Sequence, residues 1–124
     1  MKDDVQKILS LCQERISDFI EQQDPRYEWP EKFFKQIVSE VEESKAEYRD
    51  NNQVYLEDEL GDIFHALMML YSSCAAEGKI SSVENVFKRC CKKFSERHQG
   101  DWGEVKKKQK IALQEEHQKL YENK

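Results

Sequence analysis

Glycine and proline are scarce in this chain, which has four glycines and two prolines among its 124 residues. Both residue types interrupt helices, and most of them cluster where helices are expected to stop: Pro25, Pro30, Gly78, Gly100 and Gly103. Between these breaks apolar residues recur about every 3.6 residues, and no alternating run is long enough for a strand. The sequence therefore predicts an all-α protein.

Long apolar segments and paired cysteine motifs are also missing. No run approaches the roughly 18 consecutive apolar residues of a membrane-spanning helix, and residues 1–6 form no apolar signal region. The four cysteines include no C-x-x-C pair, and Cys12, Cys74 and Cys90 fall on apolar stripes, where small buried thiols are expected. We therefore expect a cytoplasmic protein in a reducing compartment, without a membrane partner.

The net charge of −5 argues against nucleic-acid binding, because a duplex requires a basic surface. A small anionic substrate is still allowed if a metal ion and a few local cations offset the charge. The length of 124 residues suits one domain, and we expect residues 1–124 to form it. Since the composition is polar, self-association would bury more apolar surface.

The periodicity predicts a bundle of four to five helices. The first three are expected at about residues 3–22, 30–51 and 53–77, a fourth begins after Ser81 or Ser82, and a charged fifth follows residues 99–101. The second helix carries Phe34, Val38 and Val41 in its apolar stripe. Its short connection to the third helix predicts a central antiparallel hairpin.

Four carboxylates lie on this hairpin at spacings that point to a metal site. Glu40 and Glu43 are three residues apart in one helix, and Glu59 and Asp62 are three apart in the next, so each pair shares a helical face. Both pairs border the apolar stripes, and oxygen ligands of this kind suit Mg²⁺ or Mn²⁺. The alternative is that all four are ordinary solvated charges paired with lysines.

Cations at four-residue steps line one edge of the fourth helix, at Arg89, Lys93 and Arg97. They either pair with acidic neighbours or bind an oxyanion. The chain has no glycine-rich phosphate loop, so a phosphate would have to be held by a metal ion and side chains. Asp62 and His65 match half of a di-iron motif, but the second half is absent, and we expect His65 to be exposed.

Several segments resemble one enzyme family. Residues 39–43, Ser-Glu-Val-Glu-Glu, and residues 59–62, Glu-Leu-Gly-Asp, are similar to the E-E-x-x-E and E-x-x-D signature of MazG-type nucleoside triphosphate pyrophosphohydrolases. Residues 93–98 resemble the family's K-L-x-R-R-H segment, and residues 102–106 its W-x-x-x-K segment. Trp29 and Pro30 occupy the place of the family's aromatic loop. The resemblance covers roughly residues 25–106.

This resemblance implies an all-α dimer or dimer of dimers, and Mg²⁺-dependent cleavage between the α and β phosphates of a nucleoside triphosphate. The implied metal ligands and catalytic residues are Glu40, Glu43, Glu59 and Asp62. The resemblance also implies the substrate-binding residues: Trp29 near the base, Lys93 and Arg97 at the phosphates, and Trp102 and Lys106 near the nucleoside and phosphates.

The chain departs from the family pattern in two places. Ser39 stands where the motif has its first glutamate, which leaves Glu42 or Glu47 as candidates for the role of that acid. The spacing between His98 and Trp102 is also shorter than in longer relatives. Two alternatives stay open: a phosphoribosyl-ATP-type pyrophosphohydrolase on the same fold, and a non-catalytic helical adaptor with an acidic face.

Overall fold

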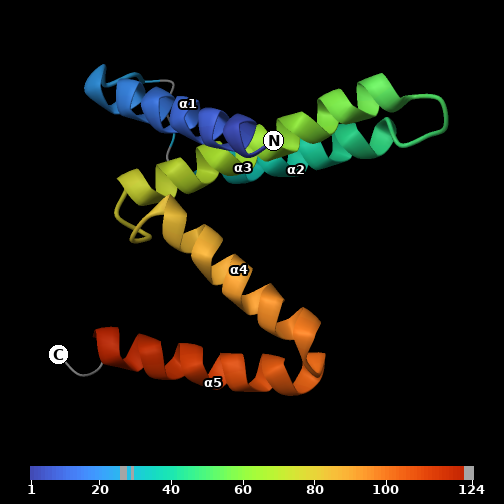
Figure 1. Ribbon diagram of the computed structural model, residues 1–124. Coiled ribbons are helices and arrows are strands. Elements are labelled where there is room, and N and C mark those ends of the chain that lie inside the picture. The colour runs from blue at the N-terminus through green and yellow to red at the C-terminus, as the bar shows by residue number, and fades with distance from the viewer. Residues whose placement is uncertain (26–27, 29, 122–124) are drawn as a thin grey trace. The chain divides into compact units, whose positions relative to one another are not determined.

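A computed structural model describes residues 1–25, 28 and 30–121. The described residues form helices and no strand (Figure 1), so the predicted all-α class is confirmed. The helices are α1 (Lys2–Glu21), α2 (Glu31–Ala46), α3 (Gln53–Ala76), α4 (Val83–Gln99) and α5 (Trp102–Tyr121).

The chain divides into two compact units, residues 1–83 and residues 84–124. In the first unit α3 packs against both α1 and α2. Leu9, Cys12 and Ile16 share one face of α1 and are at most 3% exposed, because their spacing of three and four residues turns them all inward. They belong to a core whose other members on α2 and α3 include Phe33, Ala66 and Met69.

The second helix ends earlier than predicted, at Ala46 instead of near Asn51. Asn51 has a φ of 56°, a left-handed conformation that interrupts a helix. The Asn52 side-chain amide donates a hydrogen bond of 2.7 Å to the carbonyl oxygen of Glu47, a group that helical hydrogen bonds leave unpaired at the end of α2. Asn52 thus closes the turn that joins α2 to α3 as an antiparallel hairpin.

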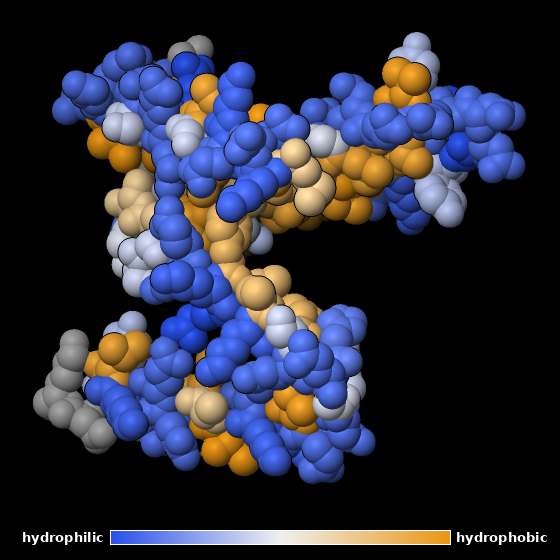
Figure 2. All heavy atoms as spheres, in the orientation of Figure 1, coloured by the Kyte–Doolittle hydropathy of each residue, from blue (hydrophilic) through white to orange (hydrophobic). Residues whose placement is uncertain are grey.

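Part of the predicted apolar stripe of α2 is left uncovered by residues 1–25, 28 and 30–121. Phe34, Val38 and Val41 are 51%, 66% and 43% exposed, and Leu60 on α3 is 50% exposed. Figure 2 shows the apolar surface along this hairpin. The hairpin therefore keeps an apolar surface that the described part of its own chain does not bury.

The second unit consists of α4 beyond Val83 together with α5, and long polar side chains link the two helices. The Arg89 guanidinium pairs with both carboxylate oxygens of Glu116, one of them at 3.2 Å, and Arg97 Nε donates to Gln109 Oε1 at 2.8 Å. No residue of α5 up to Tyr121 is buried. Ring contacts add to these polar links, because Trp102 lies 6.1 Å from Phe94 and 5.1 Å from His98 between ring centroids.

Two further expectations can be compared with the described part of the chain. None of its helices is long and apolar enough to cross a membrane. Cys12 is buried and Cys74 half-buried, as expected, but Cys90 is exposed on α4. The prediction for Cys90 was wrong, because the described residues of its own chain leave it exposed although it lies on the apolar stripe of α4.

Candidate functional site

The α2–α3 hairpin brings acidic side chains from both helices together. Glu40, Glu43 and Glu59 each offer a carboxylate oxygen, and the three oxygens lie within 4.8 Å of one another. Glu40 and Glu43 lie on neighbouring turns of α2, and the antiparallel packing sets Glu59 of α3 opposite them. We refer to Glu40, Glu43, Glu59 and Asp62 as the acidic cluster.

Asp62 approaches Glu59 from the next turn of α3. Asp58, Glu59 and Asp62 form a second set of oxygens within 4.8 Å of one another, so Glu59 belongs to both sets. The four residues of the acidic cluster therefore do not meet at one point. They form two overlapping groups that share Glu59, with Asp58 as an addition that the sequence did not single out.

Crowding of like charges changes the acidity of this cluster. The pKa of Glu59 is raised above its ordinary value, first because burial disfavours its charged form and then because Asp62 and Glu43 lie nearby. The pKa of Glu40 is raised by burial, by a hydrogen bond with the Glu43 side chain and by neighbouring negative charges. Without a cation, these two carboxyls hold protons more tightly than exposed glutamates do.

Three side-chain oxygens among the described residues are buried without any hydrogen-bond partner. They are Glu40 Oε2, Ser44 Oγ and Glu59 Oε2. Ser44 lies one helical turn after Glu40 on the same face of α2 and is 5% exposed. Since Glu40 faces Glu59 and Glu47 contacts Asn52, Ser44 lies between these two pairs on the inner side of the hairpin.

These oxygens fit a hard divalent cation. A buried polar atom without a partner is costly, and ionised carboxylates that crowd together repel one another. A divalent cation removes both penalties, and carboxylate oxygens are the ligands that Mg²⁺ and Mn²⁺ prefer. The residues available to hold it are Glu40, Glu43, Glu59 and Asp62, with Asp58 at the edge.

Glu47 and Ser39 bear on the missing first glutamate of the motif. Ser39 is exposed on α2. The Glu47 carboxylate accepts a hydrogen bond of 2.6 Å from the Asn52 amide and lies 3.3 Å from the Arg49 guanidinium. Glu47 is therefore occupied at the turn, whereas Glu42 is exposed on α2.

The predicted substrate-binding residues fall outside the acidic hairpin. Trp29 lies outside the described residues. Lys93, Arg97, Trp102 and Lys106 all belong to the second unit. There Arg97 lies 5.5 Å from the Phe94 ring centroid and 5.6 Å from that of Trp102, and Lys106 is exposed on α5.

All three cations predicted to line an edge of α4 have contacts within the second unit, and Lys93 Nζ lies 5.5 Å from the Phe94 ring centroid. Arg89 pairs with Glu116, which lowers the pKa of that carboxyl, and Arg97 is held by Gln109 and two aromatic rings. Of the two alternatives posed for these cations, pairing with an acidic neighbour or binding an oxyanion, Arg89 therefore shows the first. No sequence pattern relates Arg89 to Glu116, because they are 27 residues apart.

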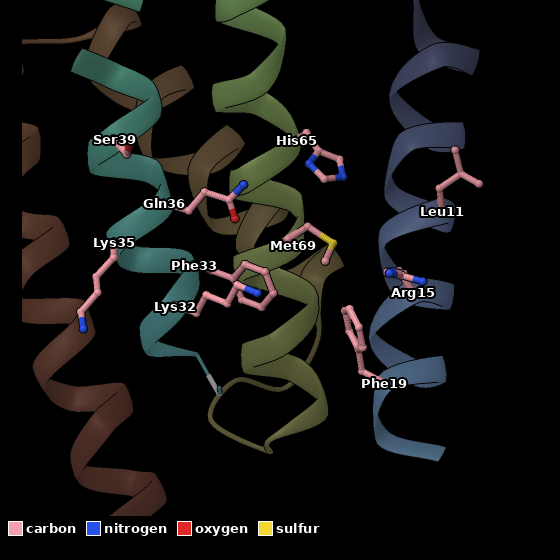
Figure 3. A pocket seen from close by; sticks show the side chains of 10 residues that line it. All are labelled: Leu11, Arg15, Phe19, Lys32, Phe33, Lys35, Gln36, Ser39, His65 and Met69. Carbon is pink, nitrogen blue, oxygen red and sulfur yellow. The ribbon is translucent and has the colours of Figure 1, made fainter. Parts of the chain in front are cut away.

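An open pocket of about 760 Å³ lies between α1, α2 and α3 (Figure 3). Its lining residues come from all three helices of the first unit: Leu11, Arg15, Phe19, Lys32, Phe33, Lys35, Gln36, Ser39, His65 and Met69. Ser39 directly precedes Glu40, so the pocket begins beside the acidic cluster. His65 is exposed, as predicted.

Comparison with known proteins gives one match. A family model described as "MazG nucleotide pyrophosphohydrolase domain" matches residues 29–102, which include the acidic cluster, Lys93, Arg97 and Trp102. No curated protein and no solved structure matches the chain.

Proposed function

The chain belongs to the MazG nucleotide pyrophosphohydrolase family, and on that basis we propose that it hydrolyses canonical or modified (deoxy)nucleoside triphosphates to monophosphate and pyrophosphate. The cofactor is Mg²⁺, for which Mn²⁺ can substitute. The reaction would remove unwanted nucleotides from the cytoplasmic pool.

The observation that carries this proposal is the pair of buried, unpartnered oxygens on Glu40 and Glu59. They belong to one group of carboxylates within 4.8 Å, and both residues have raised pKa values. An acidic face that served only to bind a partner protein would keep its oxygens in water. Buried and crowded oxygens instead favour a cation that arrives with or before an anionic substrate.

The reaction requires water to attack the α-phosphorus while the bond to the β-phosphate oxygen breaks and pyrophosphate leaves. When bound, the divalent ion would neutralise triphosphate charge and make water more acidic. Glu40, Glu43, Glu59 and Asp62 would hold that ion. For the water-orienting role of the missing motif glutamate, the candidates are Glu42, which is exposed, and Glu47, whose carboxylate contacts Asn52 and Arg49.

We assign the remaining substrate contacts from the family pattern. Lys93 and Arg97 would bind phosphates, Trp102 and Lys106 would lie near the nucleoside and phosphates, and Trp29 near the base. The geometry of Arg97 is compatible with this role, because Gln109 and two rings hold the guanidinium in one orientation. A cation that is already oriented loses less conformational entropy when it binds a phosphate.

We further propose that the chain acts as a homodimer or homotetramer. Phe34, Val38 and Val41 form an exposed apolar stripe on α2, and a second copy would bury it. One chain has a mass of 14.8 kDa, so light scattering should give about twice or four times that value. A monomer at all concentrations would contradict this assignment.

The proposal is tested by incubating the protein with a panel of nucleoside triphosphates and Mg²⁺ and separating the products. Monophosphate and pyrophosphate are expected, and Glu59→Gln should abolish their formation while the helical circular dichroism stays unchanged. Glu57→Gln is the matched control, because Glu57 is exposed on the same helix outside the acidic cluster. Failure to turn over any triphosphate would favour the adaptor alternative.

A further inference from the structure

The pocket between α1, α2 and α3 has the size and surface of a site for a flat organic group. Its volume of about 760 Å³ lies within the range of small-molecule sites. Apolar side chains contribute much of its wall, namely Phe19, Phe33, Met69 and Leu11. In Figure 3 the Phe19 ring borders the space between the helices, whereas Phe33 belongs to the core, is only 3% exposed and closes the inner side of the pocket. A planar ring can stack there.

Arg15 extends this stacking surface. Its guanidinium carbon lies 4.5 Å from the centroid of the Phe19 ring. A guanidinium over a ring offers a flat face for stacking and N–H groups at its edge. The pocket therefore presents a planar platform whose edge can donate hydrogen bonds.

The polar lining of the pocket consists largely of hydrogen-bond donors. Arg15, Lys32 and Lys35 are cations that can only donate, and Gln36, Ser39 and His65 can do either. No carboxylate lines the pocket within the described ranges. In a chain with a net charge of −5, this separation leaves a cationic pocket beside an acidic cluster.

The distance along α2 relates the pocket to the acidic cluster. Lys35 is five residues before Glu40, which corresponds to about 7.5 Å along the helix axis. Ser39 lies between them and belongs to the pocket wall. A nucleotide whose phosphates are at the carboxylates can therefore reach the pocket with its base.

We propose that this pocket binds the base of the substrate and selects keto bases, guanine, thymine and uracil, over the amino bases adenine and cytosine. At position 6 of the purines and position 4 of the pyrimidines, keto bases carry a carbonyl oxygen that accepts hydrogen bonds from cations, whereas adenine and cytosine carry an amino group that donates. Lysine and arginine pair with the O6 and N7 atoms of guanine. The amino groups of adenine and cytosine require acceptors, and the pocket offers only the neutral ones of Gln36, Ser39 and His65, against three cationic donors. This inference rests on the proposed triphosphate hydrolysis and specifies its substrate class.

The test uses the full chain and two separate measurements. Calorimetric titration with deoxynucleoside monophosphates, without metal, should give about tenfold tighter binding of dGMP and dTMP than of dAMP and dCMP. With Mg²⁺, kcat/KM for the triphosphates should follow the same order. Equal or tighter binding of the amino bases, or no binding of any monophosphate, would overturn the inference.

Charge reversal gives the matched comparison. Lys32→Glu introduces an acceptor into the pocket and should shift the preference toward amino bases by about tenfold. Lys79→Glu changes the charge equally at an exposed residue outside the pocket and should leave the preference unaltered. If both variants shift the base preference equally, the shift comes from the net charge of the protein and not from a contact in the pocket, and the inference is overturned. Keto-selective binding without hydrolysis would refute the proposed reaction alone.

Discussion

Ser44→Ala should stabilise the metal-free protein, although it removes a polar group from the centre of the hairpin. Ser44 is 5% exposed, and its hydroxyl lacks a partner among the described residues. An unsatisfied buried polar group costs about 1–3 kcal/mol. Alanine also favours a helix over serine by up to about 0.5 kcal/mol. We therefore expect the free energy of unfolding to rise by about 1–3 kcal/mol.

Ser72→Ala is the matched control. Ser72 is 4% exposed in α3, but its hydroxyl donates a hydrogen bond of 2.7 Å to the carbonyl oxygen of Met68. Its loss should cost about 1 kcal/mol, partly offset by the helix preference of alanine. The two serine variants should therefore change stability in opposite directions.

Thermal unfolding followed by circular dichroism, with a chelator present, measures the difference. For a unit of 83 residues, each 1 kcal/mol moves the midpoint by about 4–8 °C. Adding Mg²⁺ should raise the midpoint of the wild type more than that of Ser44→Ala, if the hydroxyl finds its partner in the loaded site. A loss of stability in Ser44→Ala equal to that in Ser72→Ala would refute the reasoning.

The remaining predictions concern pH and the second unit. The pKa values of Glu40 and Glu59 are higher in the folded than in the unfolded protein. The stability that their protonated forms contribute is therefore fully present below the unfolded-state pKa values and is lost as pH rises through the folded-state pKa values. Unfolding midpoints of the metal-free protein should thus fall across this interval, and Glu40→Gln should flatten the dependence; an unchanged slope would contradict the assigned cause. In the second unit, Gln109→Ala removes the contact with Arg97 and hydrogen bonds of 3.0 Å to Lys93 O and Glu96 Oε1. Amide hydrogen exchange in α4 and α5 should become about fivefold faster, as expected for about 1 kcal/mol, whereas Gln114→Ala should have no effect.

Periodicity was sufficient to predict the helices and the hairpin, because amphipathic spacing depends only on residues near in sequence. The first and third helices were placed to within one or two residues. The end of α2 could not be read this way, since no proline or glycine marks residues 47–52. It depends on the left-handed Asn51 and on the Asn52 amide.

The spacing of the acidic residues identified them as a candidate site, but it did not predict how their carboxylates group in space. Sharing of Glu59 between two sets, and the inclusion of Asp58, follow from side-chain directions on two packed helices. Ser44 carried no signal at all, because a serine in a helix is unremarkable until its hydroxyl is found buried. The cations of the pocket were equally hidden, since Arg15 and Lys32 lie on different helices.

The contact between Asn52 and Glu47 fixes the turn that joins α2 to α3, and the geometry of the acidic cluster therefore depends on the length of this turn. A residue inserted between Glu47 and Asn52 would separate the Asn52 amide from the Glu47 carbonyl and carboxylate oxygens that it contacts. The approach of Glu59 to Glu40 across the hairpin would lose this constraint, although every carboxylate was still present in the sequence. Insertions here should therefore be much less tolerated than exposure of residues 48–51 suggests, and the number of residues between Glu40 and Glu59 is itself a constraint on the site.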